Sequence, residues 1–237
     1  MKQKNKLFLS QVVANIPNDK PIIFWDACAL VDIARIPHST KGFTYQNLEQ
    51  YEAIAHWIEE GKVISMTSDI VTSEFDTHYS REYAAMIREQ NNRKNLIKGF
   101  SVFLQNVARR TRVDNAVDQL NIQNRFGSLT TRICKQTTVM RLEKEHMRFA
   151  DYRTRQKIAP ACKKGEYKDC YIWGTYLAVL KRLQPANLCN FITTNPKDYR
   201  QGTATTAQIA ADCNSVNGHI TFHIGELYSR LSRAVNP

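Results

Sequence analysis

Five side chains with oxygen donors stand at points where a strand is expected to end or a helix to begin: Asp26, Glu74, Asp169, Asn195 and Asp198. Carboxylates that converge repel one another unless a cation lies between them, so such a group predicts a divalent metal. Carboxylate, carboxamide and water are ligands that suit Mg²⁺ or Mn²⁺. Two such ions about 3.5–4 Å apart activate a water and stabilise the leaving oxygen of a phosphodiester. The chemistry that these residues predict is metal-dependent hydrolysis.

Each of these acids, taken singly, also has a structural explanation. Asp26 and Asp169 can cap helices, and Asp198 can be a turn residue. Glu74 can lie on a solvated helix face. The joint pattern is what favours a site.

The elements around these residues predict an α/β fold, an α/β/α sandwich with a central parallel sheet. Helices are expected over 27–36 and 45–60, from about 70, and over 170–180 and 225–233, and apolar runs predict buried strands at 22–25, 63–66, 190–194 and 219–223. In a parallel sheet, the carboxyl ends of strands and the starts of the following helices lie on the same edge. The acids are therefore expected to converge.

The positive charge is concentrated in the middle of the chain. The formal net charge is +11; residues 81–168 hold 20 Lys and Arg against 8 Asp and Glu, and the remainder holds 13 against 14. A solvated helical surface usually mixes the two signs, so this excess favours contact with phosphates. Residues 81–157 read as almost entirely helical, with a break at Gly127 and a further helix over 129–155.

Cysteine spacing and hydropathy exclude several protein classes. The six cysteines form no CxxC pair, which argues against a zinc site and a disulfide framework. There is no run of 18 apolar residues and no signal peptide pattern, so we expect a cytoplasmic protein without a membrane span.

With these motifs in place, the sequence resembles the PIN-domain ribonucleases, which include the VapC-like toxins. The resemblance covers about the first 80 residues and those from about 158 onward, and it rests on four segments: Ile22–Asp26 with the following Ala-Cys-Ala-Leu-Val-Asp, Ile64–Phe75, Lys168–Trp173 and Phe191–Tyr199. It implies cleavage of RNA to 5′-phosphate and 3′-hydroxyl ends, with Asp26, Glu74 and Asp169 as metal ligands. Many family members have Asp where this chain has Asn195, so either Asn195 or Asp198 completes the site.

The chain is longer between the second and third acids than small PIN toxins are, which implies the larger PIN-like type. We expect one domain over 1–237 with a basic helical insertion at about 85–157. The resemblance implies that a basic helix and a Lys-rich loop precede the third acid and bind phosphate, through Arg153, Lys157, Lys163 and Lys164. Thr193, at the end of a strand, is expected to bind substrate or to orient a carboxylate or water. His78 and His146 more often have structural roles in such positions.

Two alternatives to a ribonuclease stay open at this point. Asn195 favours a nucleic-acid-binding adaptor on a PIN scaffold with an incomplete metal site, and the sequence is also compatible with a nuclease for DNA. The resemblance implies a toxin restrained by an antitoxin, or an effector that acts during stress or phage infection, and homo-oligomers are frequent in the family. The RNA target is open.

Overall fold

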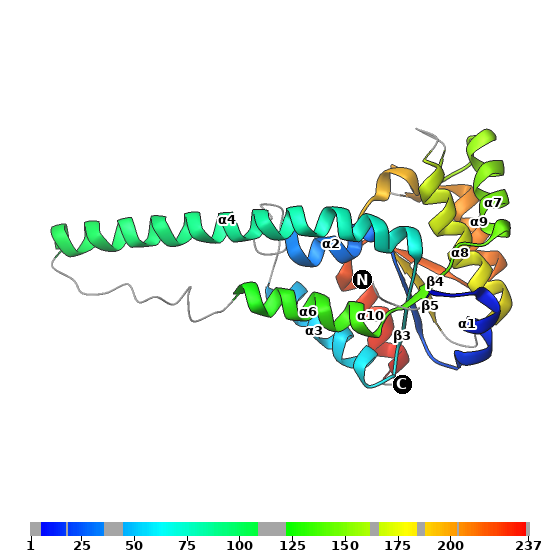
Figure 1. Ribbon diagram of the computed structural model, residues 1–237, viewed down its shortest axis with the longest axis horizontal. Helices are drawn as coiled ribbons and strands as arrows, with labels where there is room; N and C mark the ends of the chain where they lie inside the picture. The colour runs from blue at the N-terminus through cyan, green and yellow to red at the C-terminus, as the bar shows by residue number, and fades with distance from the viewer. Residues whose placement is uncertain are drawn as a thin grey trace.

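A parallel sheet forms the centre of the computed structural model, which describes residues 6–17, 19–35, 45–108, 122–161, 166–183, 188–202 and 204–235 (Figure 1). Across these residues its six strands lie in the order β1, β4, β3, β2, β5, β8. Every neighbouring pair is parallel. The strands are β1 (Lys6–Leu7), β2 (Ile22–Trp25), β3 (Ile64–Ser68), β4 (Thr138–Met140), β5 (Cys189–Ile192) and β8 (His219–Thr221).

Helices cover both faces of this sheet (Figure 1). One layer holds α2 (Ala27–Arg35), α3 (Tyr45–Glu59), α4 (Asp69–Ala108), α6 (Ile122–Gln136) and α10 (Ile224–Val235). The other holds α1 (Leu9–Asn15), α7 (Lys144–Arg155), α8 (Tyr167–Leu183) and α9 (Ala207–Ser215). Because both faces are covered, every residue of β2 and β5 is buried. The α/β/α sandwich with a parallel sheet is confirmed.

Two predicted features of the middle segment are wrong. The helix expected over 129–155 is interrupted by β4, and Gly127 lies inside α6 rather than breaking a helix. Strand β4 is only three residues long, and its Val139 and Met140 are buried between β3 and β1. Pairing with two neighbours thus overrides the helical preference of the surrounding sequence. The segment from 85 to 157 therefore contributes a strand to the sheet, while the bounds of the predicted insertion stay a prediction.

Four further elements were not expected from the sequence. They are β1, α9 and the antiparallel pair of β6 (Arg200–Gln201) and β7 (Ala204–Thr205). Each of these strands has two residues, too short to show a hydrophobic period. Among the described helices, none has the length and apolar character needed to cross a membrane.

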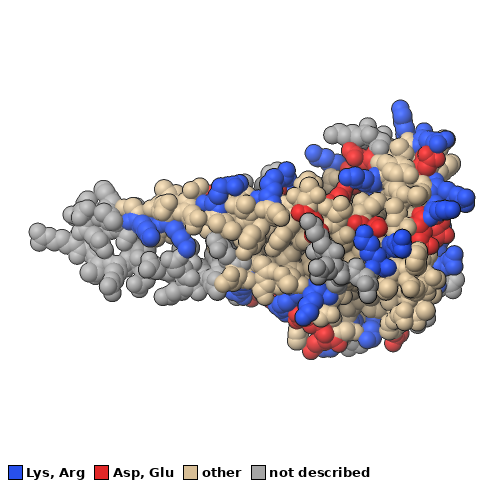
Figure 2. Space-filling model, viewed as in Figure 1, with Lys and Arg blue, Asp and Glu red and all other residues tan. Residues whose placement is uncertain are grey.

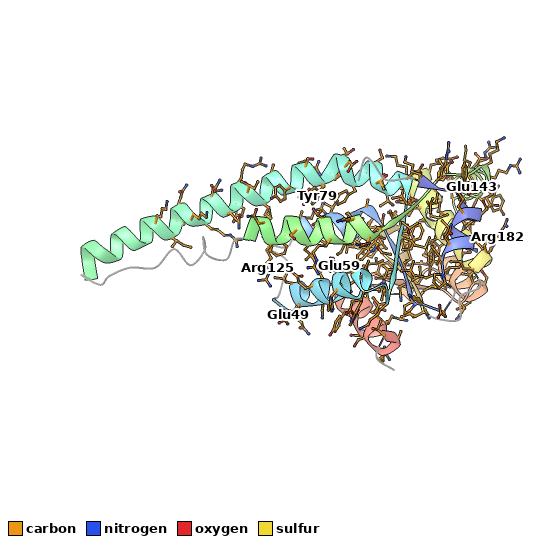
Figure 3. The ribbon with its side chains drawn as sticks, turned by 60° about the horizontal axis from the view of Figure 1, so that its bottom comes forward. Glu49, Glu59, Tyr79, Arg125, Glu143 and Arg182 are labelled. Carbon is orange, nitrogen blue, oxygen red and sulfur yellow. The ribbon has the colours of Figure 1, made fainter. Side chains whose placement is uncertain are left out.

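Helix α4 is the longest element and projects beyond the body of the molecule (Figure 1). Its 40 residues span about 60 Å at 1.5 Å per residue. The first part packs through Phe75 and Met86, which are buried, and Tyr79 points toward α6 (Figure 3). From 91 to 99 no side chain is buried. The far part of α4 thus extends without support from the core.

Candidate functional site

The strand order reverses between β2 and β5, and this reversal creates the site. From β2 the sheet continues through β3 and β4 on one side, whereas β5 and β8 lie on the other. In open α/β sheets, ligands bind beyond the carboxyl ends of the strands at such a reversal. Asp26 follows β2, and its backbone N–H donates to the carbonyl of Ile192 at the end of β5 (3.0 Å). The segment after β5 therefore lies directly beside Asp26.

A cavity of about 240 Å³ opens at this edge of the sheet. Four of the five predicted oxygen donors line it, and they come from the segments after β2 and β5, from the second turn of α4 and from the first turn of α8. The structure thus brings together residues up to 169 positions apart in the chain. The complete lining is Asp26, Ala27, Cys28, Val31, Arg35, Glu74, His78, Arg81, Asp169 and Asn195.

The Asp26 carboxylate is held by three donors at the base of the cavity. Its Oδ1 accepts from the backbone N–H of Ala27 (2.7 Å), and its Oδ2 accepts from Thr193 Oγ1 (2.6 Å) and Cys28 Sγ (2.9 Å). Burial raises the pKa of Asp26, and these hydrogen bonds lower it in part. Asp26 is therefore fixed in position. Because burial disfavours its charged form, a cation nearby would stabilise the carboxylate.

The segment after β5 is hydrogen-bonded to Thr193 and Cys28, the two side chains that also donate to Asp26 Oδ2. Thr193 Oγ1 accepts the N–H of Asn195 (3.1 Å), and Cys28 Sγ accepts the N–H of Thr194 (3.2 Å). The side chain of Thr193 has no exposed surface, so it orients Asp26 and does not contact substrate directly. This corrects its predicted role in substrate binding and agrees with the predicted role in orienting a carboxylate.

Asn195 and Asp198 form one unit of the site. Asn195 Nδ2 donates to Asp198 Oδ2 (3.0 Å), and Asn195 lines the cavity whereas Asp198 is buried behind it. With its nitrogen turned toward Asp198, the side-chain carbonyl of Asn195 is free of that bond and keeps both lone pairs. In this arrangement Asn195 is the fourth oxygen donor of the cavity, and Asp198 orients it.

Asp169 shows how strongly the acids of this cavity interact. Its pKa is raised to about 8, first by burial and then by the charges of Asp26, Asp198, Glu166 and Glu74. The positive partner at hand is Lys168, whose Nζ lies 3.2 Å from Glu74 Oε1 with its own side chain 67% exposed.

The donor set fits a hard divalent cation. Three carboxylates and one carboxamide line a single cavity, and burial and mutual repulsion raise the pKa of Asp169. Within the part of the chain that the structure describes, no three His, Cys, Asp or Glu side chains meet closely enough to hold one ion together. Mg²⁺ is commonly bound by one or two carboxylates and keeps several waters. The cavity fits that mode rather than a cage of protein ligands.

Of the four predicted phosphate-binding residues, the structure describes Arg153 and Lys157. Arg153 is 4% exposed; its guanidinium pairs with Asp212, donates to the carbonyl of Ala159 and lies over the ring of Phe149. The structure therefore corrects its predicted role, because a buried and paired guanidinium is not available to phosphate. Lys157 is exposed just after α7. The other two predicted residues, Lys163 and Lys164, lie outside the described residues.

Sequence reasoning assigned no role in the site to Cys28, Arg35 and Arg81, all of which line the cavity. Arg35 donates to Asp32 Oδ1 (3.0 Å) and Glu82 Oε1 (3.2 Å), which holds α2 against α4. Arg81 is seven residues after Glu74, a spacing that places both on the same face of a helix, so this signal was present in the sequence.

The two histidines have different positions. His146 is buried, and its Nδ1 accepts the backbone N–H of Glu143 at the start of α7 (3.2 Å), as expected of a structural residue. His78 lines the cavity one turn after Glu74, with its ring beside Arg81. Arg35, His78 and Arg81 thus line the cavity beside its acids, and both arginines also pair with Glu82.

Comparison with known proteins gives one match. A family model described as the PIN domain matches residues 23–199. No curated protein and no solved structure matches the chain significantly. The matched range contains every element that lines the cavity.

Proposed function

The chain belongs to the PIN-domain family, whose members are generally nucleases, and from that premise we propose that it is a metal-dependent endoribonuclease. The observation that supports this most is the cavity at the sheet reversal, lined by Asp26, Glu74, Asp169 and Asn195. Hard oxygen donors are concentrated there at a cost that only a cation offsets. A phosphodiester is a substrate that such an ion and the arginines of the cavity would both attract.

Each residue of the cavity has a distinct role in this proposal. When bound, Mg²⁺ or Mn²⁺ supplies a water of lowered pKa and a positive charge for the leaving oxygen. Asp26, Glu74 and Asp169 would bind the ion. Asn195 adds a carbonyl oxygen, with its amide oriented by Asp198. Arg81, which is 66% exposed, faces the same cavity and attracts the phosphate.

RNA as the substrate, and the biological setting, rest on the resemblance to PIN ribonucleases. The proposed setting is a cytoplasmic toxin restrained by an antitoxin, or an effector of stress or phage defence, with a homo-oligomer as the proposed assembly. Cleavage of DNA instead of RNA is the competing activity. It is tested by offering a DNA strand of the same sequence as the RNA.

The test replaces one carboxylate of the proposed metal site at a time by a carboxamide. We expect Asp26→Asn and Asp169→Asn to lower RNA cleavage at least about 100-fold while RNA affinity stays within about twofold, because the ion and not the RNA is lost. Asp151→Asn is the matched control, since Asp151 is an exposed acid on α7 paired with Arg155. Cleavage of labelled RNA is followed with Mg²⁺, with Mn²⁺ and with a chelator. Full activity of Asp26→Asn would refute the mechanism.

A second candidate function is an RNA-binding adaptor, and Asn195 is the observation that favours it, because a carboxamide binds a cation more weakly than a carboxylate does. Calorimetric titration with Mn²⁺ separates the two functions. An adaptor binds RNA without cleavage and gives no heat of metal binding that depends on Asp26.

A further inference from the structure

One face of α4 begins in the cavity and continues outward along the whole exposed helix. A spacing of seven residues returns to nearly the same side of an α-helix, with a drift of about 20° per repeat. Glu74, Arg81, Arg88 and Asn95 have this spacing. We call these residues the α4 stripe. Its inner members, Glu74 and Arg81, line the cavity.

The α4 stripe faces away from the core over its whole length. Arg81, Arg88 and Asn95 are exposed, whereas Phe75, Tyr79 and Met86, on the other side of the helix, pack against the body. Figure 3 shows Tyr79 pointing from α4 toward α6. No element of the described chain covers the stripe beyond Arg81 (Figure 1).

The charge of this part of α4 matches a polyanion. From 90 to 108 the helix contains no Asp or Glu but has Arg93, Lys94 and Lys98. Lys and Arg side chains lie along the projecting helix in Figure 2. Within the stripe itself, the residues beyond Glu74 are two arginines and an asparagine, which are donors to phosphate oxygens. Nearer the body the helix also carries Glu82 and Glu89, which pair with Arg81 and Arg93, so the excess of positive charge is clearest from 90 outward.

We propose that the α4 stripe is the track for the RNA strand that flanks the scissile phosphate. This inference rests on the proposed function and names its substrate class: RNA with an unpaired strand on one side of the cut. Arg88 lies 14 residues from Glu74, about 21 Å along the helix. At roughly 3.4 Å per nucleotide of a stacked strand, that distance corresponds to about six nucleotides.

The chain offers a matched control for Arg88. Arg93 is also an exposed arginine of α4, with its guanidinium paired only to Glu89 in the described contacts (2.9 Å). Five residues separate the two, which places Arg93 about 140° around the helix from Arg88. Arg88→Ala and Arg93→Ala therefore remove the same charge from the same helix, and only one of them removes it from the α4 stripe.

The experiment measures binding of a labelled 20-nucleotide oligouridylate to the full chain carrying Asp26→Asn, so that the probe is not cut. We expect Arg88→Ala to weaken binding about three- to tenfold and to reduce the slope of log affinity against log salt by about 0.7, the value for one phosphate contact of a single strand. Arg93→Ala should change affinity less than about twofold, and Arg88→Lys should retain most of it. Equal losses of affinity for Arg88→Ala and Arg93→Ala, or no loss for either, would refute the proposal that RNA lies along the α4 stripe.

Cleavage by the chain with Asp26 intact separates this inference from the proposed function. If the chain cleaves the oligouridylate and Arg88→Ala leaves kcat/KM unchanged, the track is wrong and the nuclease stands. If Arg88→Ala weakens binding selectively but no RNA is ever cleaved, the track stands and the nuclease is wrong.

Discussion

At the scale of single residues, Asp169 is the group whose protonation should be easiest to observe. Its pKa is raised from 3.8 to about 8 in the folded chain. An unfolded chain loses this proton near pH 4, whereas the folded chain keeps it until about pH 8. Through Asp169 the folded state therefore binds more protons in that range, and the contribution of this residue to the free energy of unfolding of the metal-free protein falls as pH rises from about 4 to about 8.

The affinity for metal should depend on the same ionisation of Asp169, but it should rise with pH. Mg²⁺ needs the ionised carboxylate, so its affinity rises with pH up to about 8, and binding near pH 7 releases a proton. We expect saturating Mg²⁺ to raise the melting temperature more at about pH 8 than at about pH 6. Asp169→Asn should remove most of that difference. An equal shift at the two pH values in the unmodified chain would contradict the prediction.

The residues of the site differ in how far the sequence could predict them. Asp26, Glu74, Asp169 and Asn195 were predictable because each follows a strand or opens a helix. Arg153 was not, because only the fold shows that its guanidinium faces Asp212, a residue 59 positions away. A positive charge in the sequence thus does not distinguish a phosphate contact from a buried ion pair.

At the scale of elements, Asp212 joins three helices of one layer. Its Oδ2 accepts from Arg153 on α7 and from Trp173 Nε1 on α8 (2.8 Å), while Asp212 itself belongs to α9. Both members of the ion pair are largely buried. Removing one partner of a buried pair leaves the other without compensation, which is far more costly than losing an exposed pair.

We therefore expect Arg153→Ala to destabilise the fold by about 3–5 kcal/mol, without a selective loss of RNA affinity in the fraction that stays folded. Lys157→Ala is the control, because Lys157 is exposed and should change stability by less than about 0.5 kcal/mol. Urea unfolding followed by circular dichroism measures both. An Arg153→Ala variant with an unchanged free energy of unfolding would show that the pair with Asp212 contributes little to stability.

Strand β4 shows why the element prediction failed where it did. Helices such as α8 and strands such as β2 carry apolar runs long enough to indicate their type. Three residues, Thr138–Met140, carry no such period, and they become a strand only because β3 and β1 lie on either side. Short strands of this kind depend on contacts from distant parts of the chain.

At the scale of the whole molecule, the described chain is a packed body with one long helix extending from it (Figure 1). Most helical stability in proteins comes from packing of an apolar face, and α4 buries Val71, Phe75 and Met86, whereas no side chain from 91 to 99 is buried. We expect the backbone amides of 92–99 to exchange hydrogen with solvent much faster than those of 72–86. Exchange read out by mass spectrometry tests this. Uniform protection along α4 would show that something covers its outer half.

The order of the sheet has a consequence for the chain during its synthesis on the ribosome. Asp26 and Glu74 leave the exit tunnel early, but β2 has no neighbour on one side until β5 follows at 189–192. Asn195 is made later still, after about four-fifths of the polypeptide. If the chain is the ribonuclease proposed above, we expect the nascent chain to be inert until Asn195 has emerged, since both halves of the cavity must be present at once.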